Sequence, residues 1–393
     1  MHILFVRNYP TIDGVFTLLL RLAKHFKNDG HTVYFIDFGL QSDFQHEIIS
    51  TFTLLTTKEL KSKKDELHFD IIFPFVDGDL LCWCITVLKL KLFKSAKMVF
   101  GIYHPRAYFN SSYLNTSSDS RLNKFIYTQI PSQNILFMNE VVKRENEYYF
   151  KHKFQNSPII PIPITLEYQK RNNEKIDRRK IVSIGRLETF KSYVIPMIDT
   201  IQDLNNDGNY FEFYIYGHGS MESFLKNYIA EKKAGKYIFL MGKLEYKELF
   251  SVLVDAFMFV GMGTAIIEAS AIGVPSLQAI DNEKGIMTYG FFDKLKGFSL
   301  GEVIPELPLV SMKNSIIELS IKNVAEYEQI CEEHIIRANT FNINEVIKDY
   351  YNFFLNASNV FDFRMSNFVL ITTKFLRQAF KLRQFVKPNL KTK

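Results

Sequence analysis

The strongest constraint on the fold of this 393-residue chain is a regular alternation of two kinds of segment. Short runs rich in Val, Ile, Phe and Tyr alternate with segments of helical period, which is typical of βα units around parallel sheets. In the first half, the pattern predicts strands at residues 2–6, 31–38, 70–75, 98–104 and 134–138. In the second half, it predicts strands at residues 180–184, 211–216, 237–241, 256–260 and 275–280. The sequence therefore predicts the α/β class.

A proline-rich segment followed by a charged one separates the two series. Residues 157–165 read Ser-Pro-Ile-Ile-Pro-Ile-Pro-Ile-Thr, and residues 169–180 are dense in Lys, Arg, Asn and Glu. Because proline interrupts regular structure, we interpret this stretch as a linker. We predict two Rossmann-like domains, over residues 1–165 and 166–340, each large enough to bury its own core. Ligands of such open sheets bind at the carboxyl ends of the strands, in the cleft between two sheets of this kind.

Charge and cysteine content exclude several classes of protein. The net charge is +6, but residues 364–393 hold eight Lys or Arg and no acid, so the rest of the chain has a net charge of −2. This balance argues against a nucleic-acid-binding domain. The three cysteines form neither a metal-ligand spacing nor an even set, which favours a reducing cytoplasm. No apolar run reaches the roughly 20 residues of a spanning helix, and the N-terminus lacks the apolar stretch of a signal peptide.

Two cations follow the first predicted strand of the second half. Residues 185–191 read Gly-Arg-Leu-Glu-Thr-Phe-Lys, so Arg186 and Lys191 come just beyond the carboxyl end of that strand. An Arg fork and a Lys point charge suit a departing diphosphate without the help of a metal. Alternatively, they are two solvated cations near a Lys-rich linker.

Glycine-rich turns follow two further strands. After residues 256–260, Gly261, Met262, Gly263 and Thr264 form a turn that opens a helix, whose free amide groups favour a phosphate. Glu268, one turn into that helix, can accept hydrogen bonds from a ribose diol. The alternative is a tight βα turn with no ligand, because a lone Gly-x-Gly is a weak signal.

The other glycine-rich turn is Gly217-His218-Gly219, which also follows a strand. Its glycines suit a contact with the nucleotide or its pyrophosphate. We interpret His218 as a loop residue rather than a catalyst, because no nearby residue would orient it.

The series Ile184-Gly185-Arg186 with Lys191, Tyr216-Gly217-His218-Gly219, and Gly263-Thr264 with the run from Glu268 to Pro275 resembles the retaining glycosyltransferases of family four, which have the GT-B fold. The resemblance is close over residues 180–279 and looser in the first half. In that family the Arg and Lys bind the donor diphosphate and the Glu binds the ribose. It implies those roles for Arg186, Lys191 and Glu268, no metal cofactor, and a crossover helix within residues 341–363.

One position departs from the family pattern. The family has a second Glu eight residues before the ribose-binding one, and here that position is Val260. Since that carboxylate commonly touches the transferred sugar, the identity of the sugar stays open. A diverged enzyme, or backbone contacts from Met262 to Thr264, are the alternatives.

In the first half, the resemblance implies a functional histidine at His104. In that family, transfer is described as front-face and retaining, and the leaving phosphate helps to deprotonate the acceptor. The resemblance therefore implies that His104 positions sugar hydroxyls rather than acting as a strong base. By itself, a histidine before a proline is more often structural. The predicted contacts on the acceptor or phosphate side lie on turns after strands. They are Arg7, Asn8, Asp13, Gly14 and Arg106.

The basic tail at residues 364–393 contains an amphipathic pattern. On a helical projection, Phe368, Ile371 and Phe375 lie on one side, and Lys374 and Arg377 on another. Such a segment suits an anionic membrane surface, with each cation contributing about 1 kcal/mol. The alternative is a last helix packed on the first domain.

Taken with the resemblance, these features predict transfer of a hexose-type sugar from a nucleotide diphosphate to a growing glycan, with a lipid-linked acceptor. The setting is bacterial surface polysaccharide assembly (O-antigen or capsule) at the inner face of the plasma membrane. A non-catalytic scaffold of the same fold and a nucleotide-sugar epimerase are the alternatives. Loop geometry, which sets sugar, acceptor and linkage, is not readable from the sequence.

Overall fold

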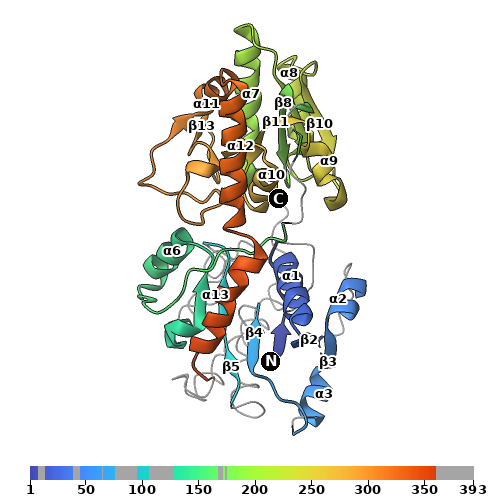
Figure 1. Ribbon diagram of the computed structural model, residues 1–393, viewed down its shortest axis with the longest axis vertical. Helices are drawn as coiled ribbons and strands as arrows, with labels where there is room; N and C mark the ends of the chain where they lie inside the picture. Colours follow the sequence, from blue (N-terminus) through green and yellow to red (C-terminus); the bar gives the residue numbers. More distant parts are fainter. Residues whose placement is uncertain are drawn as a thin grey trace, which may run out of the picture. The chain divides into compact units, whose positions relative to one another are not determined.

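The computed structural model describes residues 1–7, 14–38, 45–63, 65–75, 95–105, 127–166, 171–172 and 175–359. The chain divides into two compact units. Unit 1 comprises Met1–Pro163 with Ile347–Lys393, and unit 2 comprises Ile164–Val346. Each contains a parallel sheet and helices (Figure 1), so the predicted α/β class is confirmed.

The main sheet of unit 1 has the strand order β3-β2-β1-β4-β5. All four pairings are parallel, with His2 opposite Thr32 and Ile3 opposite Ile71 in the registers of the central strand. The strands are β1 (His2–Val6), β2 (Thr32–Asp37), β3 (Thr53–Thr56), β4 (Ile71–Pro74) and β5 (Lys97–Met98). A separate parallel pair consists of β6 (Phe100–Ile102) and β7 (Ile135–Phe137).

Apolar periodicity explains the helices that cover unit 1. Helix α1 (Gly14–Asn28) buries Leu19, Leu22 and Phe26 and ends before Gly30, whose φ of +81° suits glycine. The other helices of this unit in the described ranges are α2 (Gln45–Thr51), α3 (Thr57–Ser62), α6 (Glu140–Phe150) and most of α13 (Ile343–Asn356).

Helix α13 joins the C-terminal part of the chain to the core of unit 1. Its Phe354 ring lies 5.6 Å from the ring of Phe26 and 6.0 Å from that of Phe73. Its Tyr351 hydroxyl donates to Asp29 at 2.7 Å. The contacts of this helix therefore tie residues more than 300 positions apart into one core. The basic tail, residues 364–393, lies outside the described residues.

The sheet of unit 2 has the order β10-β9-β8-β11-β12, again with parallel pairings throughout. Its strands are β8 (Asp177–Ile184), β9 (Glu212–Tyr216), β10 (Ile238–Gly242), β11 (Ala256–Gly261) and β12 (Ser276–Gln278). The helices are α7 (Val194–Asn206), α8 (Glu222–Glu231), α9 (Leu249–Leu253), α10 (Thr264–Ile272), α11 (Met312–Ser320) and α12 (Val324–Asn339). An antiparallel pair, β13 (Met287–Thr288) and β14 (Val310–Ser311), completes it.

The strand order of unit 2 determines where a ligand would bind. The chain moves outward from β8 to β9 and β10, then returns to the other side of β8 with β11 and β12. Such a reversal opens a crevice at the carboxyl ends of the two strands that flank it, here β8 and β11. Strand β11 is buried along its whole length, as its apolar run predicts.

Each predicted strand overlaps a strand of the structure, with shifted ends. The run at 98–104 contributes to two sheets, because β5 ends at Met98 and β6 begins at Phe100. Strand β3 was not predicted, since Thr53–Thr56 is a short stretch with only two apolar residues.

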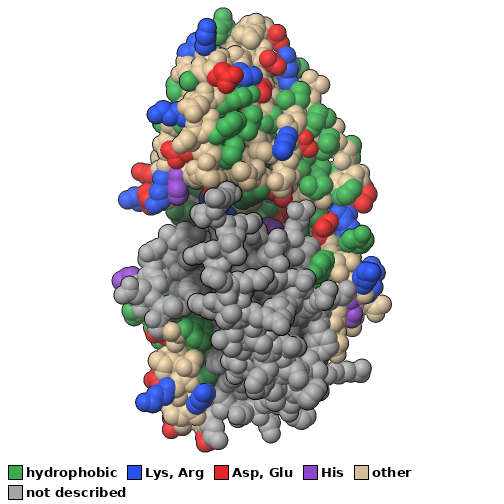
Figure 2. Space-filling view, turned by 180° about the vertical axis from the view of Figure 1, so that it is seen from behind, with side chains coloured by type: hydrophobic (Ala, Val, Ile, Leu, Met, Phe, Trp, Pro, Cys, Tyr) green, Lys and Arg blue, Asp and Glu red, His purple; other side chains and the backbone are tan. Residues whose placement is uncertain are grey.

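On the face of unit 2 shown in Figure 2, basic and acidic side chains are interspersed. Among the described helices, none has the length and apolar composition needed to cross a bilayer.

Candidate functional site

The loop after β8 brings Lys191 back over its own first residue. Gly185 follows the last residue of the strand, and its N–H donates to the Tyr216 carbonyl of β9 at 3.0 Å. A short 3₁₀ helix (Thr189–Lys191) then returns the chain, so that a Cβ on Gly185 would lie 2.5 Å from Lys191 Nζ. The ammonium group therefore occupies the space that a side chain at position 185 would need.

The two cations of this loop form no ion pair within the described residues. The Arg186 guanidinium lies 5.9 Å over the Phe190 ring, and Glu188 of the same loop interacts with it at longer range. Burial, with a smaller contribution from the positive charge of Arg186, lowers the pKa of Lys191 to about 8. Glu188 accepts a hydrogen bond from the Ser220 hydroxyl at 2.6 Å and is not ion-paired with either cation, so the two like charges favour an anion.

Close packing explains why the turn after β9 contains Gly217 and Gly219. A Cβ on Gly217, whose φ is +145°, would lie 1.9 Å from the Gly185 carbonyl oxygen. A Cβ on Gly219 would lie 2.5 Å from the Leu187 carbonyl oxygen. The backbone of His218 accepts a hydrogen bond from the Leu187 N–H at 3.0 Å, while its side chain is exposed. These glycines let the two loops pack backbone against backbone, which fixes the loop that carries Arg186.

The turn after β11 presents a helix N-terminus. Gly263 has a φ of +72° and is the N-cap residue of α10, and no side chain caps this helix. The Gly263 N–H donates to the Leu300 carbonyl at 2.7 Å, but the amides of Thr264 and Ala265 belong to the first turn, where helices have no internal acceptor. This end carries the positive pole of the helix dipole.

Other residues of this turn and of α10 are buried or half-buried. Glu268, in the second turn of α10, is buried, and Met262 is half-buried. A Cβ on Gly261 would lie 2.6 Å from the Phe259 ring and 3.6 Å from the Tyr193 hydroxyl. Gly261 is thus required by close packing under the turn.

Two contributions to this edge were not predicted from the sequence. The Tyr193 hydroxyl lies 3.0 Å from that of Ser183, and burial raises the pKa of Tyr193 to about 12, so this pair is a neutral buried support. The loop at residues 299–302 packs against Met262, since a Cβ on Gly301 would lie 2.7 Å from the Met262 Cβ. Only the positive φ of Gly301, +123°, marks that loop, and a φ value is not visible in a sequence.

Val260, where the resembling family has a glutamate, is fully buried. It pairs with Leu277 of β12 and belongs to the same apolar core as Ile181 and Met258. A carboxylate at this position of β11 would be enclosed by hydrocarbon, which disfavours its charged form. The valine is therefore a core residue in this chain.

The remaining predicted residues belong to unit 1. Arg7 follows β1, half-buried, with its guanidinium 5.9 Å over the Phe16 ring. Gly14 is the first residue of α1, and His104 is exposed two residues after β6. Asn8, Asp13 and Arg106 lie outside the described residues.

The segment that carries the loops described above is similar to known proteins. Residues 165–286 match the family "Glycosyl transferases group 1". Over 217 residues the chain is 25% identical to the GtfA subunit of a UDP-N-acetylglucosamine–peptide N-acetylglucosaminyltransferase from Streptococcus agalactiae. That alignment covers 52% of this chain and 41% of the relative, so the chain matches only about two fifths of that protein.

Solved structures show the fold over most of the chain. TarM from S. aureus, crystallised with UDP, superposes with a TM-score of 0.62 at 12% identity, covering 90% of this chain and 99% of that one. A glycosyltransferase from Rickettsia africae gives 0.64 at 14% identity, with 90% and 97% covered. The galactosyltransferase WaaB gives 0.59 at 13% identity, with 90% and 99% covered. These likenesses confirm the predicted GT-B fold of two Rossmann-like domains, and the segment that matches group 1 glycosyl transferases lies within unit 2.

Proposed function

We propose that this protein transfers a sugar from a nucleotide diphosphate donor to a glycan acceptor. One observation carries the proposal: two cations without ion pairs follow β8, and an uncapped helix N-terminus follows β11, its hydrogen-bonded neighbour. Both features attract a diphosphate. The match of residues 165–286 to group 1 glycosyltransferases supports a nucleotide sugar as the source of that diphosphate.

In the proposed complex, Arg186 and Lys191 hold the diphosphate together with the first-turn amides of α10. Glu268, buried in the second turn of α10, accepts hydrogen bonds from the ribose diol, the role that the family resemblance implies for it. The donor nucleotide is uridine diphosphate in this proposal, supported by the UDP-N-acetylglucosamine named for the GtfA relative and the UDP named for the TarM complex.

We infer retaining transfer at the front face of the donor sugar. The bond between the anomeric carbon and the diphosphate oxygen breaks, and the acceptor oxygen forms the new bond to that carbon. The acceptor proton passes to the leaving phosphate. Arg186 and Lys191 stabilise the charge that develops on the diphosphate, so the chain needs neither a metal ion nor a strong base in this scheme. In unit 1, His104 positions sugar hydroxyls, with Arg7 and Gly14 near the acceptor.

The acceptor in this proposal is a growing, lipid-linked surface glycan. WaaB, which acts in the lipopolysaccharide outer core by its title, supports that class. The basic residues of 364–393 would hold the enzyme at an anionic inner membrane surface. Deleting these residues and measuring sedimentation with anionic vesicles tests this part; unchanged sedimentation contradicts it.

The donor site is tested by calorimetric titration of UDP, GDP and their sugars into the full chain and two variants. We expect Arg186→Ala and Glu268→Gln each to weaken binding of the preferred nucleotide by about tenfold or more. Lys243→Ala is the matched control, because Lys243 follows β10 at the same edge but pairs with Glu245 at 2.9 Å. Unchanged affinity in both site variants would disprove the donor site.

Val260 favours one second candidate, a non-catalytic scaffold that keeps the nucleotide site. Its burial in the core leaves β11 without the carboxylate that touches the sugar in the resembling family. The discriminating measurement is sugar release or transfer across a panel of donors. Nucleotide binding without either reaction supports the scaffold, and turnover excludes it.

A further inference from the structure

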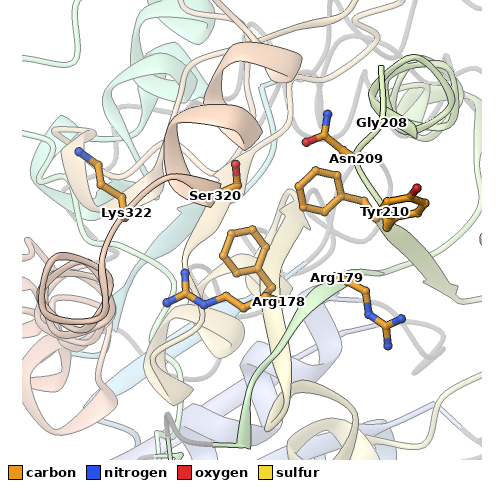
Figure 3. A pocket seen from close by; sticks show the side chains of 9 residues that line it. Arg178, Arg179, Gly208, Asn209, Tyr210, Ser320 and Lys322 are labelled. Carbon is orange, nitrogen blue, oxygen red and sulfur yellow. The ribbon is translucent and has the colours of Figure 1, made fainter. Parts of the chain in front are cut away.

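A hollow of about 500 Å³ opens at the edge of the unit 2 sheet opposite the glycine-rich turns (Figure 3). Its lining comes from four segments of the chain that the fold assembles at the amino ends of β8, β9 and β11. They supply Arg178 and Arg179, then Gly208 to Phe211, then Phe257, then Ser320 and Lys322.

Arg178 lines this hollow with a guanidinium that has no carboxylate partner among the described residues. It lies 4.3 Å over the Tyr327 ring and 5.6 Å over the Phe257 ring, so aromatic faces hold it in place. Stacking leaves the N–H groups at the edge of the fork free to donate in the ring plane.

The neighbouring arginine differs in this respect. Arg179 donates to both carboxylate oxygens of Asp177 at 3.1 Å. Figure 3 shows the two guanidinium groups pointing in opposite directions, as successive side chains of a strand do. Of the two arginines, Arg178 is therefore the one available to an anion.

The rest of the lining is partly cationic and partly aromatic. Lys322, on the rim, is only loosely paired, with 3.8 Å between its Nζ and Glu326. Tyr210 is 78% exposed, while Phe211 and Phe257 are buried and form the apolar part of the wall. A bare inorganic anion would use only the cationic part of this lining and leave the rings without an apolar partner. An organic anion with an apolar face satisfies both parts of the lining.

We propose that this hollow is a binding site for an anionic sugar, with its carboxylate or phosphate on Arg178, its C–H face against the aromatic side chains of the lining, and Lys322 and Tyr210 on the rim. Acidic and phosphorylated sugars share that chemistry. The site does not depend on the proposed donor site, since its residues precede the strands whose carboxyl ends carry Arg186 and the α10 turn.

The test is a titration of the full chain, followed by calorimetry, with glucuronate, glucose 6-phosphate, glucose and inorganic phosphate. We expect saturable binding of a charged sugar and at least tenfold weaker binding of glucose and of inorganic phosphate. The two charged sugars distinguish a carboxylate from a phosphate as the preferred group. Equal binding of inorganic phosphate or of glucose, or no binding of either charged sugar, overturns the proposal.

The variants locate the binding. Arg178→Ala should weaken binding of the charged sugar about tenfold or more. Arg179→Ala, the matched control, should change that affinity by less than about twofold. Equal losses in both variants contradict the assignment.

Because Arg178 also packs on Tyr327, Tyr210→Ala and Lys322→Ala serve as second variants on the exposed rim. Each should weaken binding of the charged sugar severalfold without lowering the thermal unfolding temperature of the protein. If neither does, the proposal fails. Arg186→Ala should leave this binding intact, which separates the site from the donor site.

Discussion

The two ends of strand β8 use cations in different ways. At the amino end, Arg179 pairs with Asp177 at 3.1 Å and Lys180 pairs with Asp255 at 2.5 Å, and only Arg178, stacked on the Tyr327 ring, has no carboxylate partner among the described residues. At the carboxyl end, neither Arg186 nor Lys191 forms an ion pair within the described residues, although Glu188 of the same loop interacts with Arg186 at longer range, and the pKa of Lys191 falls to about 8. The difference shows that charge count alone does not mark a site. What marks it is positive charge that the protein itself leaves uncompensated.

The strongest test of this comparison is removal of the carboxyl-end charge. Arg186→Ala should lower kcat for sugar transfer by about 10² to 10³, because one donor to the developing charge of the leaving group is lost. Steady-state kinetics with the preferred nucleotide sugar measures the effect. Lys243→Ala should stay within about twofold of the unaltered protein, and a similar loss in that control would mean that the edge responds to net charge only.

The packing that holds this loop can be broken separately. Gly217→Ala should lower the free energy of unfolding by about 2–3 kcal/mol, since the added Cβ meets the Gly185 carbonyl and the backbone has a φ of +145°. Gly235→Ala is the control, because a Cβ there has no neighbour within 4 Å. Urea unfolding measures both, and equal stability of the two variants would show that the loops are not held by this contact.

A change of pH sharpens the contrast without a mutation. Nucleotide diphosphate affinity should be flat below pH 8 and fall by up to about tenfold per pH unit above it, because the free protein loses the Lys191 charge near its pKa of about 8 and a bound anion raises that pKa. Calorimetry between pH 7 and 9.5 measures the slope. Lys191→Arg should remove it, and a slope that survives this substitution must come from another group.

The smallest effect is expected at the amino end. Lys180→Met should change the free energy of unfolding by less than about 1 kcal/mol, because its partner Asp255 is exposed to solvent and such pairs contribute little. Nucleotide affinity should not change. A loss of affinity measured by the same titration would show that the two ends of β8 are coupled.

Much of the fold could be predicted from local pattern. The apolar run Ala256–Gly261 predicts a buried strand, and the structure contains one there. Strand β3 could not be predicted, since Thr53–Thr56 becomes a strand by pairing with β2 rather than by its own composition.

The residues of the proposed donor site could be predicted only in part from local pattern. Positions such as Arg186, Lys191 and Gly263 follow strands, and a turn after a parallel strand always emerges at the carboxyl edge. Their roles toward a donor stay predictions. The need for glycine at position 217 could not be predicted. It arises because the Gly185 carbonyl oxygen, in the loop after β8, would lie 1.9 Å from a Cβ at that position.

The sequence by itself determined the alternation of strands and helices, and with it the edge of the sheet at which the glycine-rich turns lie. Only the tertiary structure decided which cations are compensated and which are not. Arg178 and Arg179 are adjacent and chemically identical, yet one pairs with Asp177 and the other lies on the Tyr327 ring, 149 positions away. Alternation along a strand is a local property, whereas the neighbour that each side chain meets is set by the packing of distant segments.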